Sequence, residues 1–431
     1  MTETSTDPAE FVLRIDSLTY GPHGVGRRKG QAIFVPMTAP GDEARARIIE
    51  QRKNYALGEI TQLLRPSPSR QTPPCPYFGA CGGCQWQHVT YSAQLAAKEK
   101  NVEDALRRIG KLENFELLPI ICSPREYHYR RRVRLQTDGQ KKLGFYRAFS
   151  HELIEIDSCL IADPLLDRHL SHLKTWAGEL KTCLREIEII RGDQSEEIVF
   201  AGEAEGDFCT EDETVSASFL TRQPEISGLI LFGRGWRHSW GRARISICSP
   251  NGIKIEADAE TFTQANREAN ELLVNQLLGW GEFHDQDQVL ELYAGAGNFT
   301  LPVAQRSRQV FAVEGNRQSV ENGKMNSQLN RLENIRWICS NVPKATKQLA
   351  KSREKFSKII LNPPRSGAKE LEEDLSPLGA EKILYVSCNP TTLARDLATL
   401  NKRGYRLKRV RPIDLFPQTF HVETLAEVTR G

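Results

Sequence analysis

Two residues near the carboxyl end of the chain could carry covalent chemistry on a heterocyclic ring. Cys388 follows the apolar run KILYVS and precedes Asn-Pro, and Glu423 lies in the stretch FPQTFHVETLAEV. A thiolate that adds to carbon 6 of uracil turns carbon 5 into a nucleophile, so that a difficult step is divided into two easier ones. A carboxylate can then remove the proton from carbon 5 and let the thiolate leave. Cys388 is the candidate nucleophile and Glu423 the candidate base; an inert buried thiol and a solvated strand residue are the structural alternatives.

A glycine turn upstream of these residues predicts a cofactor site. The stretch ELYAGAGNFT places Gly295 and Gly297 directly after an apolar strand, where a tight turn lets a ligand approach the backbone. The next strand ends in Glu314, a spacing of about twenty positions at which a carboxylate can bind a ribose. Thr300 replaces the third glycine of the dinucleotide motif, so the pattern favours S-adenosylmethionine over NAD. Asn362 begins the segment NPPR at the end of another strand, and its two prolines make the backbone rigid there.

A cluster of cysteines predicts a metal site. Cys75, Cys81 and Cys84 have the spacing C-x5-C-x2-C, with glycines that let the loop wrap around a ligand. Clustered thiolates in a reducing compartment indicate metal binding or catalysis. Cys159, in the turn-like segment IEIDSCLIADP, is the best candidate for a fourth ligand. The spacing alone leaves both zinc and a 4Fe-4S cluster open.

A basic stretch with aromatic residues predicts contact with nucleic acid. Residues 125–147 contain eight Arg or Lys against two acidic residues, and Tyr127, Tyr129, Phe145 and Tyr146 are interleaved with them. Basic side chains bind phosphates, while aromatic rings can stack on unpaired bases. A solvated hairpin face is the alternative interpretation.

The elements around these motifs predict three domains. Residues 8–64 read as short alternating strands and predict a small β-barrel, and a Pro-rich break follows at 65–76. The region 65–255 is predicted to be mostly β, apart from a helix around 93–118 that we expect to pack on the next domain. Residues 256–431 alternate strands with helices and predict a doubly wound parallel α/β sheet.

The overall composition constrains the cellular setting. The 431 residues carry a net charge of only +3, so a nucleic-acid signal must come from local clusters of charge. The sequence has no run of about 18 apolar residues, and its polar start is unlike a signal peptide. We therefore expect a cytoplasmic protein without a membrane partner, and a monomer.

The four motifs ELYAGAGNFTLPVA, NPPRSGA, YVSCNPTTLARD and FPQTFHVETLAEV together resemble the S-adenosylmethionine-dependent RNA (uracil-5)-methyltransferases, over about residues 11–430. The resemblance implies a Rossmann-like methyltransferase domain, with Cys388 as nucleophile and Glu423 as base. It also implies cofactor contacts at Gln264, Tyr293, Gly295, Asn298, Glu314, Asn341 and Asn362. Asn362 departs from the Asp that is common in this family, and an amide can form hydrogen bonds but cannot act as a base.

The amino-terminal segments GPHGVGRRKG and IFVP resemble the TRAM domain, an OB-like RNA-binding barrel. Iron-sulfur members of the methyltransferase family carry the C-x5-C-G-G-C pattern and a distant cysteine. This resemblance implies a 4Fe-4S cluster on Cys75, Cys81, Cys84 and Cys159. It also implies an RNA substrate, 23S ribosomal RNA ahead of transfer RNA, whose target uridine must leave its stack.

Two functions outside this family remain open from the sequence. A nitrogen methyltransferase of nucleic acids would use NPPR to hold an exocyclic amine, although Arg365 stands where an aromatic residue is expected and Cys388 would have no role. A non-catalytic RNA-binding protein is the more distant alternative.

Overall fold

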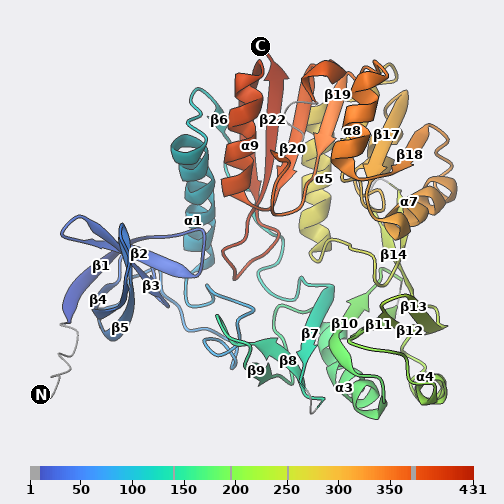
Figure 1. Cartoon of the computed structure of the whole chain (residues 1–431). Coiled ribbons are helices and arrows are strands. Elements are labelled where there is room, and N and C mark those ends of the chain that lie inside the picture. The colour runs from blue at the N-terminus through green and yellow to red at the C-terminus, as the bar shows by residue number, and fades with distance from the viewer. Residues whose placement is uncertain (1–9, 139–140, 195–196, 250–251, 370–374) are drawn as a thin grey trace, which may run out of the picture.

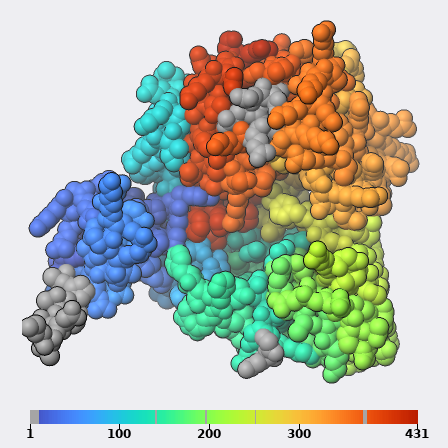
Figure 2. All heavy atoms as spheres, viewed as in Figure 1, coloured from blue at the N-terminus to red at the C-terminus, as the bar shows by residue number. Residues whose placement is uncertain are grey.

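The computed structural model describes residues 10–138, 141–194, 197–249, 252–369 and 375–431, and Figure 1 shows three parts. A barrel lies to one side, a central domain lies at the bottom of the view, and a carboxyl-terminal α/β domain lies above it. The space-filling view shows the barrel standing out from the other two domains (Figure 2). Among the described residues, no helix is both long and apolar enough to cross a membrane.

Five strands close the amino-terminal barrel in the order β1-β2-β3-β5-β4. The strands are β1 (Phe11–Leu18), β2 (His23–Arg28), β3 (Gln31–Pro36), β4 (Glu43–Gln51) and β5 (Tyr55–Arg65). Leu13, Ile15, Ile33 and Val35 are buried inside the barrel, because side chains on a strand alternate between its two faces. The predicted barrel is confirmed; residues 8 and 9, where its domain was predicted to begin, lie outside the described residues.

Helix α1 (Tyr91–Asp104) connects the cysteine-rich loop to the carboxyl-terminal domain, and it continues into a π-helical turn, Ala105–Ile109. Lys98 Nζ lies 2.6 Å from Asp414 Oδ1, and both side chains are fully buried. Removing one partner of such a pair would leave an uncompensated charge in the interior, so the ion pair ties α1 firmly to that domain. The helix ends earlier than predicted, because the short strand β6 (Glu116–Leu117) pairs with the carboxyl-terminal sheet.

The central domain contains a seven-stranded sheet in the order β13-β12-β11-β10-β7-β8-β9 and a separate two-stranded sheet, β14-β15. Its strands are β7 (Arg132–Thr137), β8 (Leu143–Tyr146), β9 (Leu153–Glu155), β10 (Leu184–Arg191), β11 (Ile198–Ala204), β12 (Gly228–Gly233), β13 (Trp236–Gly241), β14 (Arg244–Cys248) and β15 (Lys254–Asp258). Its helices are α2 (Pro164–Arg168), α3 (Leu170–Glu179) and α4 (Glu211–Arg222). The sequence prediction missed these helices; Trp176 of α3 and Phe219 of α4 are buried in the core that they share with the sheet.

The carboxyl-terminal domain is built on an eight-stranded sheet in the order β18-β17-β16-β19-β20-β22-β21-β6. Its remaining strands are β16 (Gln288–Leu292), β17 (Gln309–Glu314), β18 (Ile335–Cys339), β19 (Lys358–Leu361), β20 (Lys382–Ser387), β21 (Tyr405–Ile413) and β22 (Glu423–Arg430). Its helices are α5 (Arg267–Gly281), α6 (Thr300–Ala304), α7 (Arg317–Leu329), α8 (Val342–Lys351) and α9 (Pro390–Lys402), with a short 3-10 turn, Ser376–Leu378.

The order of the strands differs from the predicted all-parallel sheet in one respect that matters for the site. Strands β16 to β20 are parallel, but β22 enters between β20 and β21 and is antiparallel to both. Ser387 at the end of β20 therefore pairs with Thr424 at the start of β22. This arrangement brings Cys388 and Glu423, which follow and precede those residues, to the same edge of the sheet.

Candidate active site

A cavity of about 750 Å³ lies between the central domain and the carboxyl ends of strands β16, β17, β19 and β20. Tyr293, Glu314, Asn362 and Cys388 stand at the ends of these four strands and line it. The opposite wall comes from the central domain. Such an edge is where open α/β sheets bind ligands, and the volume is that of a site for a small molecule.

The glycine turn is hydrogen-bonded to Glu314, the carboxylate predicted to bind a ribose. The backbone N–H of Gly295 donates to Glu314 Oε2 over 3.0 Å, and the N–H of Asn316 donates to Glu314 Oε1 over 2.8 Å. Each carboxylate oxygen can accept a second hydrogen bond, so Glu314 keeps acceptor capacity for a ribose diol. Gly297 has φ of 105°, and a Cβ there would lie 3.0 Å from Leu301 Cγ, so both conformation and space require glycine.

Thr300, which replaces the third glycine, has a partner of its own. Its hydroxyl donates to Glu291 Oε2 over 2.6 Å, and both residues are buried beneath the turn. Burial, with a smaller contribution from Glu314, raises the pKa of Glu291 to about 8, although the hydrogen bond from Thr300 opposes the rise. A threonine at this position therefore satisfies a buried carboxyl group that a glycine would leave without that hydrogen bond.

The remaining predicted cofactor contacts divide into two groups. Gln264, Tyr293, Asn298 and Asn362 line the cavity, and Asn298 is held by a reciprocal amide pair with Asn270 at 2.8 and 3.1 Å. Asn341 does not line it. Its side chain accepts the N–H of Lys344 over 3.1 Å, which caps helix α8, and it borders a separate shallow pocket. The sequence pattern could not separate these roles, because Asn-Val-Pro is also a common way to begin a helix.

Cys388, Glu423 and Arg365 form the polar end of the cavity. Burial raises the pKa of Glu423 to about 8, while Arg365 opposes that rise. Burial also raises the pKa of the Cys388 thiol, the charge of Glu423 raises it further, and Arg365 lowers it through its charge and a hydrogen bond. The thiol is thus shielded from water next to one cation that favours its ionised form.

The Asn-Pro after the cysteine explains why the strand stops there. Asn389 caps helix α9, because its side chain accepts the N–H of Thr391 over 3.0 Å, and Pro390 occupies the first helical position. Cys388 therefore stands immediately before a helix amino terminus, where the helix dipole favours a negative charge. The same side chain donates to the carbonyl of Arg365 over 3.2 Å, which connects this turn to the NPPR segment.

Two further residues lie near this end of the cavity. The Tyr20 hydroxyl, from the turn between β1 and β2 of the barrel, donates to the Cys388 carbonyl over 2.9 Å, and its ring packs edge-on against Phe420 at 5.6 Å. His421 lies in the loop before β22 and lines the cavity with Glu423. Burial and, to a smaller extent, nearby cations including Arg365 lower the pKa of His421 to about 4, so the imidazole is neutral at physiological pH.

The central-domain wall of the cavity carries arginines that were expected to bind RNA. Arg131 lines the cavity and is ion-paired with Asp193, and Arg132 is buried with its guanidinium 2.7 Å from Glu188. Tyr129 is buried as well, with its hydroxyl on the Pro417 carbonyl. These parts of the basic stretch 125–147 stabilise the domain and the cavity wall instead of extending into solvent; residues 139 and 140 lie outside the described residues.

The four predicted metal-binding cysteines meet in a second, much smaller pocket. Cys75, Cys81, Cys84 and Cys159 all line it, together with Phe145, another residue of the basic stretch. Burial raises the pKa of Cys84 to about 12 and that of Cys159 to about 11, and the other thiols add to the rise at Cys84. Four thiols gathered in one small pocket are suited to bind a cation, which would stabilise their ionised forms.

Comparison with known proteins places this geometry in a family. Residues 251–430 match the model described as tRNA (Uracil-5-)-methyltransferase, and residues 10–61 match the TRAM domain. The chain is 34% identical to the 23S rRNA (uracil(1939)-C(5))-methyltransferase RlmD of Histophilus somni, over 98% of this chain and 97% of the relative. It is 30% identical to an uncharacterized RNA methyltransferase of Halalkalibacterium halodurans, over 96% of this chain and 95% of that protein.

A solved structure shares the fold. The tRNA (uracil-54, C5)-methyltransferase of Pyrococcus abyssi, in complex with S-adenosyl-L-homocysteine, matches with a TM-score of 0.75 and 24% identity, over 98% of this chain and 100% of that one. The expected barrel and methyltransferase domain are both borne out by these matches. The chain belongs to the S-adenosylmethionine-dependent RNA uracil-5-methyltransferases, and it carries a TRAM domain at its amino terminus.

Proposed function

We propose that this enzyme methylates carbon 5 of one uridine in 23S ribosomal RNA, through a covalent bond between Cys388 and carbon 6. The observation that carries the mechanism is the common cavity of Cys388, Glu423 and the glycine turn. Support for the substrate comes from relatives of nearly the same length in Histophilus, Pasteurella and Vibrio, which are named as methyltransferases of uracil 1939 in 23S rRNA.

Cys388 begins the reaction by addition. Its sulfur bonds to carbon 6, the electron pair of the 5,6 double bond moves to carbon 5 and the adjoining carbonyl, and carbon 5 becomes nucleophilic. Arg365 and the amino terminus of α9 favour the thiolate that this step requires. S-adenosylmethionine supplies an electrophilic methyl group on a positively charged sulfur.

Glu423 completes the reaction by taking the remaining proton from carbon 5. The electron pair of that C–H bond re-forms the 5,6 double bond, and the bond between carbon 6 and the Cys388 sulfur breaks. A carboxylate whose pKa is raised to about 8 is a stronger base than an exposed one, and it must be ionised when it takes the proton from carbon 5. Burial of Glu423 beside the cysteine thus serves the second half of the reaction.

The cofactor contacts that we propose are Gln264, Tyr293, Gly295, Asn298, Glu314 and Asn362, which share the cavity with the catalytic pair. Asn341 stays a predicted contact: its Oδ1 caps helix α8, which leaves the amide N–H groups able to donate to a ligand. Asn362 offers an amide where an aspartate is common, so we assign it hydrogen bonding to the uracil edge or the cofactor and no proton transfer.

We also propose that Cys75, Cys81, Cys84 and Cys159 hold a 4Fe-4S cluster. A tetrahedral zinc site with bonds of about 2.3 Å would bring its sulfurs to about 3.8 Å from one another. Among the described residues, no three of these sulfurs lie within 4.8 Å of one another, a spread that supports the larger cubane cluster. Four thiolate ligands leave no iron open to substrate, so the cluster's contribution is to hold the loop 75–84 to the segment around Cys159.

Three alternatives can be distinguished from this proposal. A transfer RNA substrate is favoured by the description of the matching family model, whereas the full-length relatives favour ribosomal RNA. A nitrogen methyltransferase would leave the Cys388 and Glu423 pair without a function, and a non-catalytic RNA-binding protein would not need the cavity. We further propose that the enzyme acts as a monomer in the cytoplasm, where RNA and S-adenosylmethionine are available.

Release of tritium tests the substrate and the chemistry together. Ribosomal and transfer RNA transcripts labelled with tritium at carbon 5 of uracil are incubated with S-adenosylmethionine and either wild type or Cys388→Ala. We expect release from 23S transcripts with wild type alone. Release only from transfer RNA would show that transfer RNA is the substrate. Methyl incorporation without tritium release would exclude carbon 5 as the target.

A further inference from the structure

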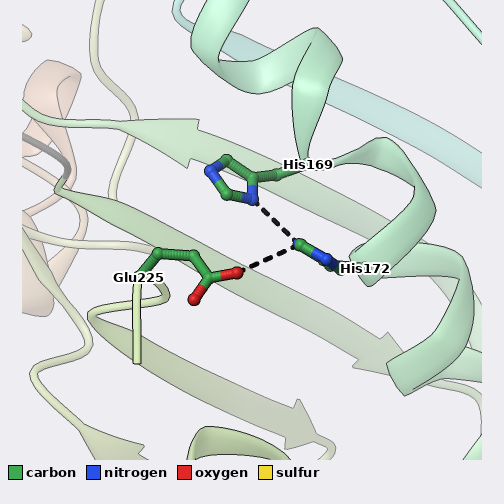
Figure 3. Close-up of side chains that lie close together, drawn as sticks. All are labelled: His169, His172 and Glu225. Carbon is green, nitrogen blue, oxygen red and sulfur yellow. Dashed lines mark hydrogen bonds and ion pairs between the residues drawn. The ribbon is translucent and has the colours of Figure 1, made fainter. Parts of the chain in front are cut away.

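Three metal-ligating side chains converge in the central domain, outside both the cavity and the cysteine pocket. His169 lies between α2 and α3, His172 lies in the first turn of α3, and Glu225 follows α4. Figure 3 shows the three side chains turned toward one another. Each can offer one ligand atom so that all three atoms lie within 4.8 Å of one another.

The fold fixes these residues independently of any ligand. His169 is the N-cap of α3 and His172 lies in its first turn, so the two rings meet at the start of the helix. Leu170 and Leu173 of the same helix are buried in the domain core, and so is Ile226, which follows Glu225 directly. The histidines and the carboxylate are therefore held close together by anchors on both sides, in the way that a preformed ligand site requires.

The distances suit a tetrahedral ion. His169 Nδ1 lies 2.9 Å from His172 Nδ1, and His172 Nδ1 lies 3.6 Å from Glu225 Oε1. Zinc bound at about 2.0–2.1 Å by nitrogen or oxygen would separate neighbouring ligand atoms by about 3.4 Å, so shifts of a few tenths of an ångström convert one arrangement into the other. Imidazole and carboxylate are ligands that zinc commonly takes.

The partial exposure of His172 and Glu225 lets an ion reach the site from solvent. His169 is only 6% exposed, whereas the side chains of His172 and Glu225 are 31% and 32% exposed. The buried imidazole of His169 lies at the inner side of the site, and solvent reaches His172 and Glu225. A water molecule can therefore bind the ion as a fourth ligand. Without an ion, the two imidazoles satisfy each other by a hydrogen bond, which requires the proton to sit on Nδ1 of one ring.

We propose that His169, His172 and Glu225 bind one Zn²⁺ ion, with water as the fourth ligand, and that this ion joins α3 to the turn after α4. The site is separate from the cysteine pocket and from the methyl-transfer reaction. Its expected effect is to raise the melting temperature of the central domain when zinc is bound, because the ion binds the folded state and not the unfolded one.

Zinc binding to the full chain tests the proposal. Protein with its cysteine site loaded is freed of weakly bound metal with a mild chelator and titrated with ZnCl2 against a chromophoric competitor. The variants are His172→Gln and Glu225→Gln. The matched control is His238→Gln, which alters a histidine whose Nδ1 lies 2.8 Å from Glu213 in the same domain but which belongs to no three-ligand group among the described residues.

We expect wild type and His238→Gln to bind one zinc equivalent more than His172→Gln or Glu225→Gln, or to bind it at least ten times more tightly. Cobalt bound in its place should show visible bands without the near-ultraviolet absorption of a thiolate ligand. The proposal is overturned if wild type takes up no additional zinc, if both variants bind zinc as wild type does, or if the bound cobalt shows thiolate absorption.

Discussion

The cavity and the cysteine pocket both contain buried thiols, but the surroundings of those thiols differ. In the cavity a single thiol, Cys388, faces Arg365 and a buried carboxyl group, with about 750 Å³ of space around it. In the pocket, four thiols share a small space lined by mostly apolar side chains and by one arginine, Arg130. Burial raises the pKa of the thiol in both places, so pKa alone does not distinguish a nucleophile from a metal ligand.

The neighbours make that distinction. A lone thiol beside a cation and an open cavity can ionise, add to a substrate and leave again. In the pocket one cation, Arg130, stands against four thiols, and a metal centre would supply the positive charge that their ionised forms still need. The lone thiol in the cavity is suited to catalysis, and the four thiols in the pocket are suited to a structural metal centre.

The largest expected difference between the two regions is in activity. Cys388→Ser should lower methyl transfer by ~10³-fold or more, because the hydroxyl is a far weaker nucleophile at neutral pH. Its melting temperature and its affinity for S-adenosylmethionine should stay close to those of wild type. Single-turnover methylation and calorimetry measure both, and substantial activity in the variant would assign the chemistry to another residue.

The cysteine pocket should show the opposite behaviour. Cys84→Ser removes one of four ligands in a buried site, so we expect loss of iron and a fall in the free energy of unfolding on the order of several kcal/mol. Iron analysis and denaturant unfolding check this, with Cys339→Ser as the control because Cys339 is exposed. Full stability of Cys84→Ser with unchanged iron would remove this cysteine from the ligand set.

A third contrast uses pH. Glu423 has a pKa of about 8 in the folded protein against a usual 4.5, so the folded state holds a proton that the unfolded state loses. Stability is therefore fully present below about pH 4.5 and falls as pH rises toward 8. Glu423→Gln removes this dependence, and its melting temperature relative to wild type should rise across that window, by the equivalent of a few kcal/mol or less. A pH-independent difference between the two proteins would contradict a raised pKa.

The smallest expected effect concerns the barrel. Tyr20→Phe removes the hydrogen bond to the Cys388 carbonyl and keeps the ring that packs against Phe420. A typical hydrogen bond contributes about 0.5–1.5 kcal/mol, so kcat should fall about 2- to 10-fold, with little change in the KM for RNA. A change confined to KM would instead indicate that Tyr20 contacts the RNA.

The motifs could be predicted from the sequence because each is local. The glycine turn, Glu314 and the cysteine cluster require only a few residues in a recognisable order. In the structure they lie at strand ends and in loops, as the sequence predicts. The meeting of Cys388 and Glu423 was predicted from chemistry but not from topology. In an all-parallel sheet the start of the last strand would lie at the far edge, and only the antiparallel entry of β22 brings Glu423 to the cysteine.

Contacts between domains could not be predicted from the sequence. Tyr20 reaches Cys388 across 368 positions, and Arg131 lines the cavity from the central domain, yet neither lies in a motif that signals such a role. At Asn341, Arg131 and Arg132, residue type predicted a ligand contact but could not reveal the partners that these side chains have within the protein.

Trapping of the covalent intermediate tests the central claim most directly. Glu423→Gln cannot remove the proton from carbon 5, so the bond between Cys388 and carbon 6 should persist after methyl transfer. We expect a denaturation-resistant complex of this variant with a 23S RNA fragment and S-adenosylmethionine, mapped to Cys388 by mass spectrometry and lost in the double variant with Cys388→Ala. A complex that survives in the double variant, or rapid product release by Glu423→Gln, would contradict the roles assigned to the pair.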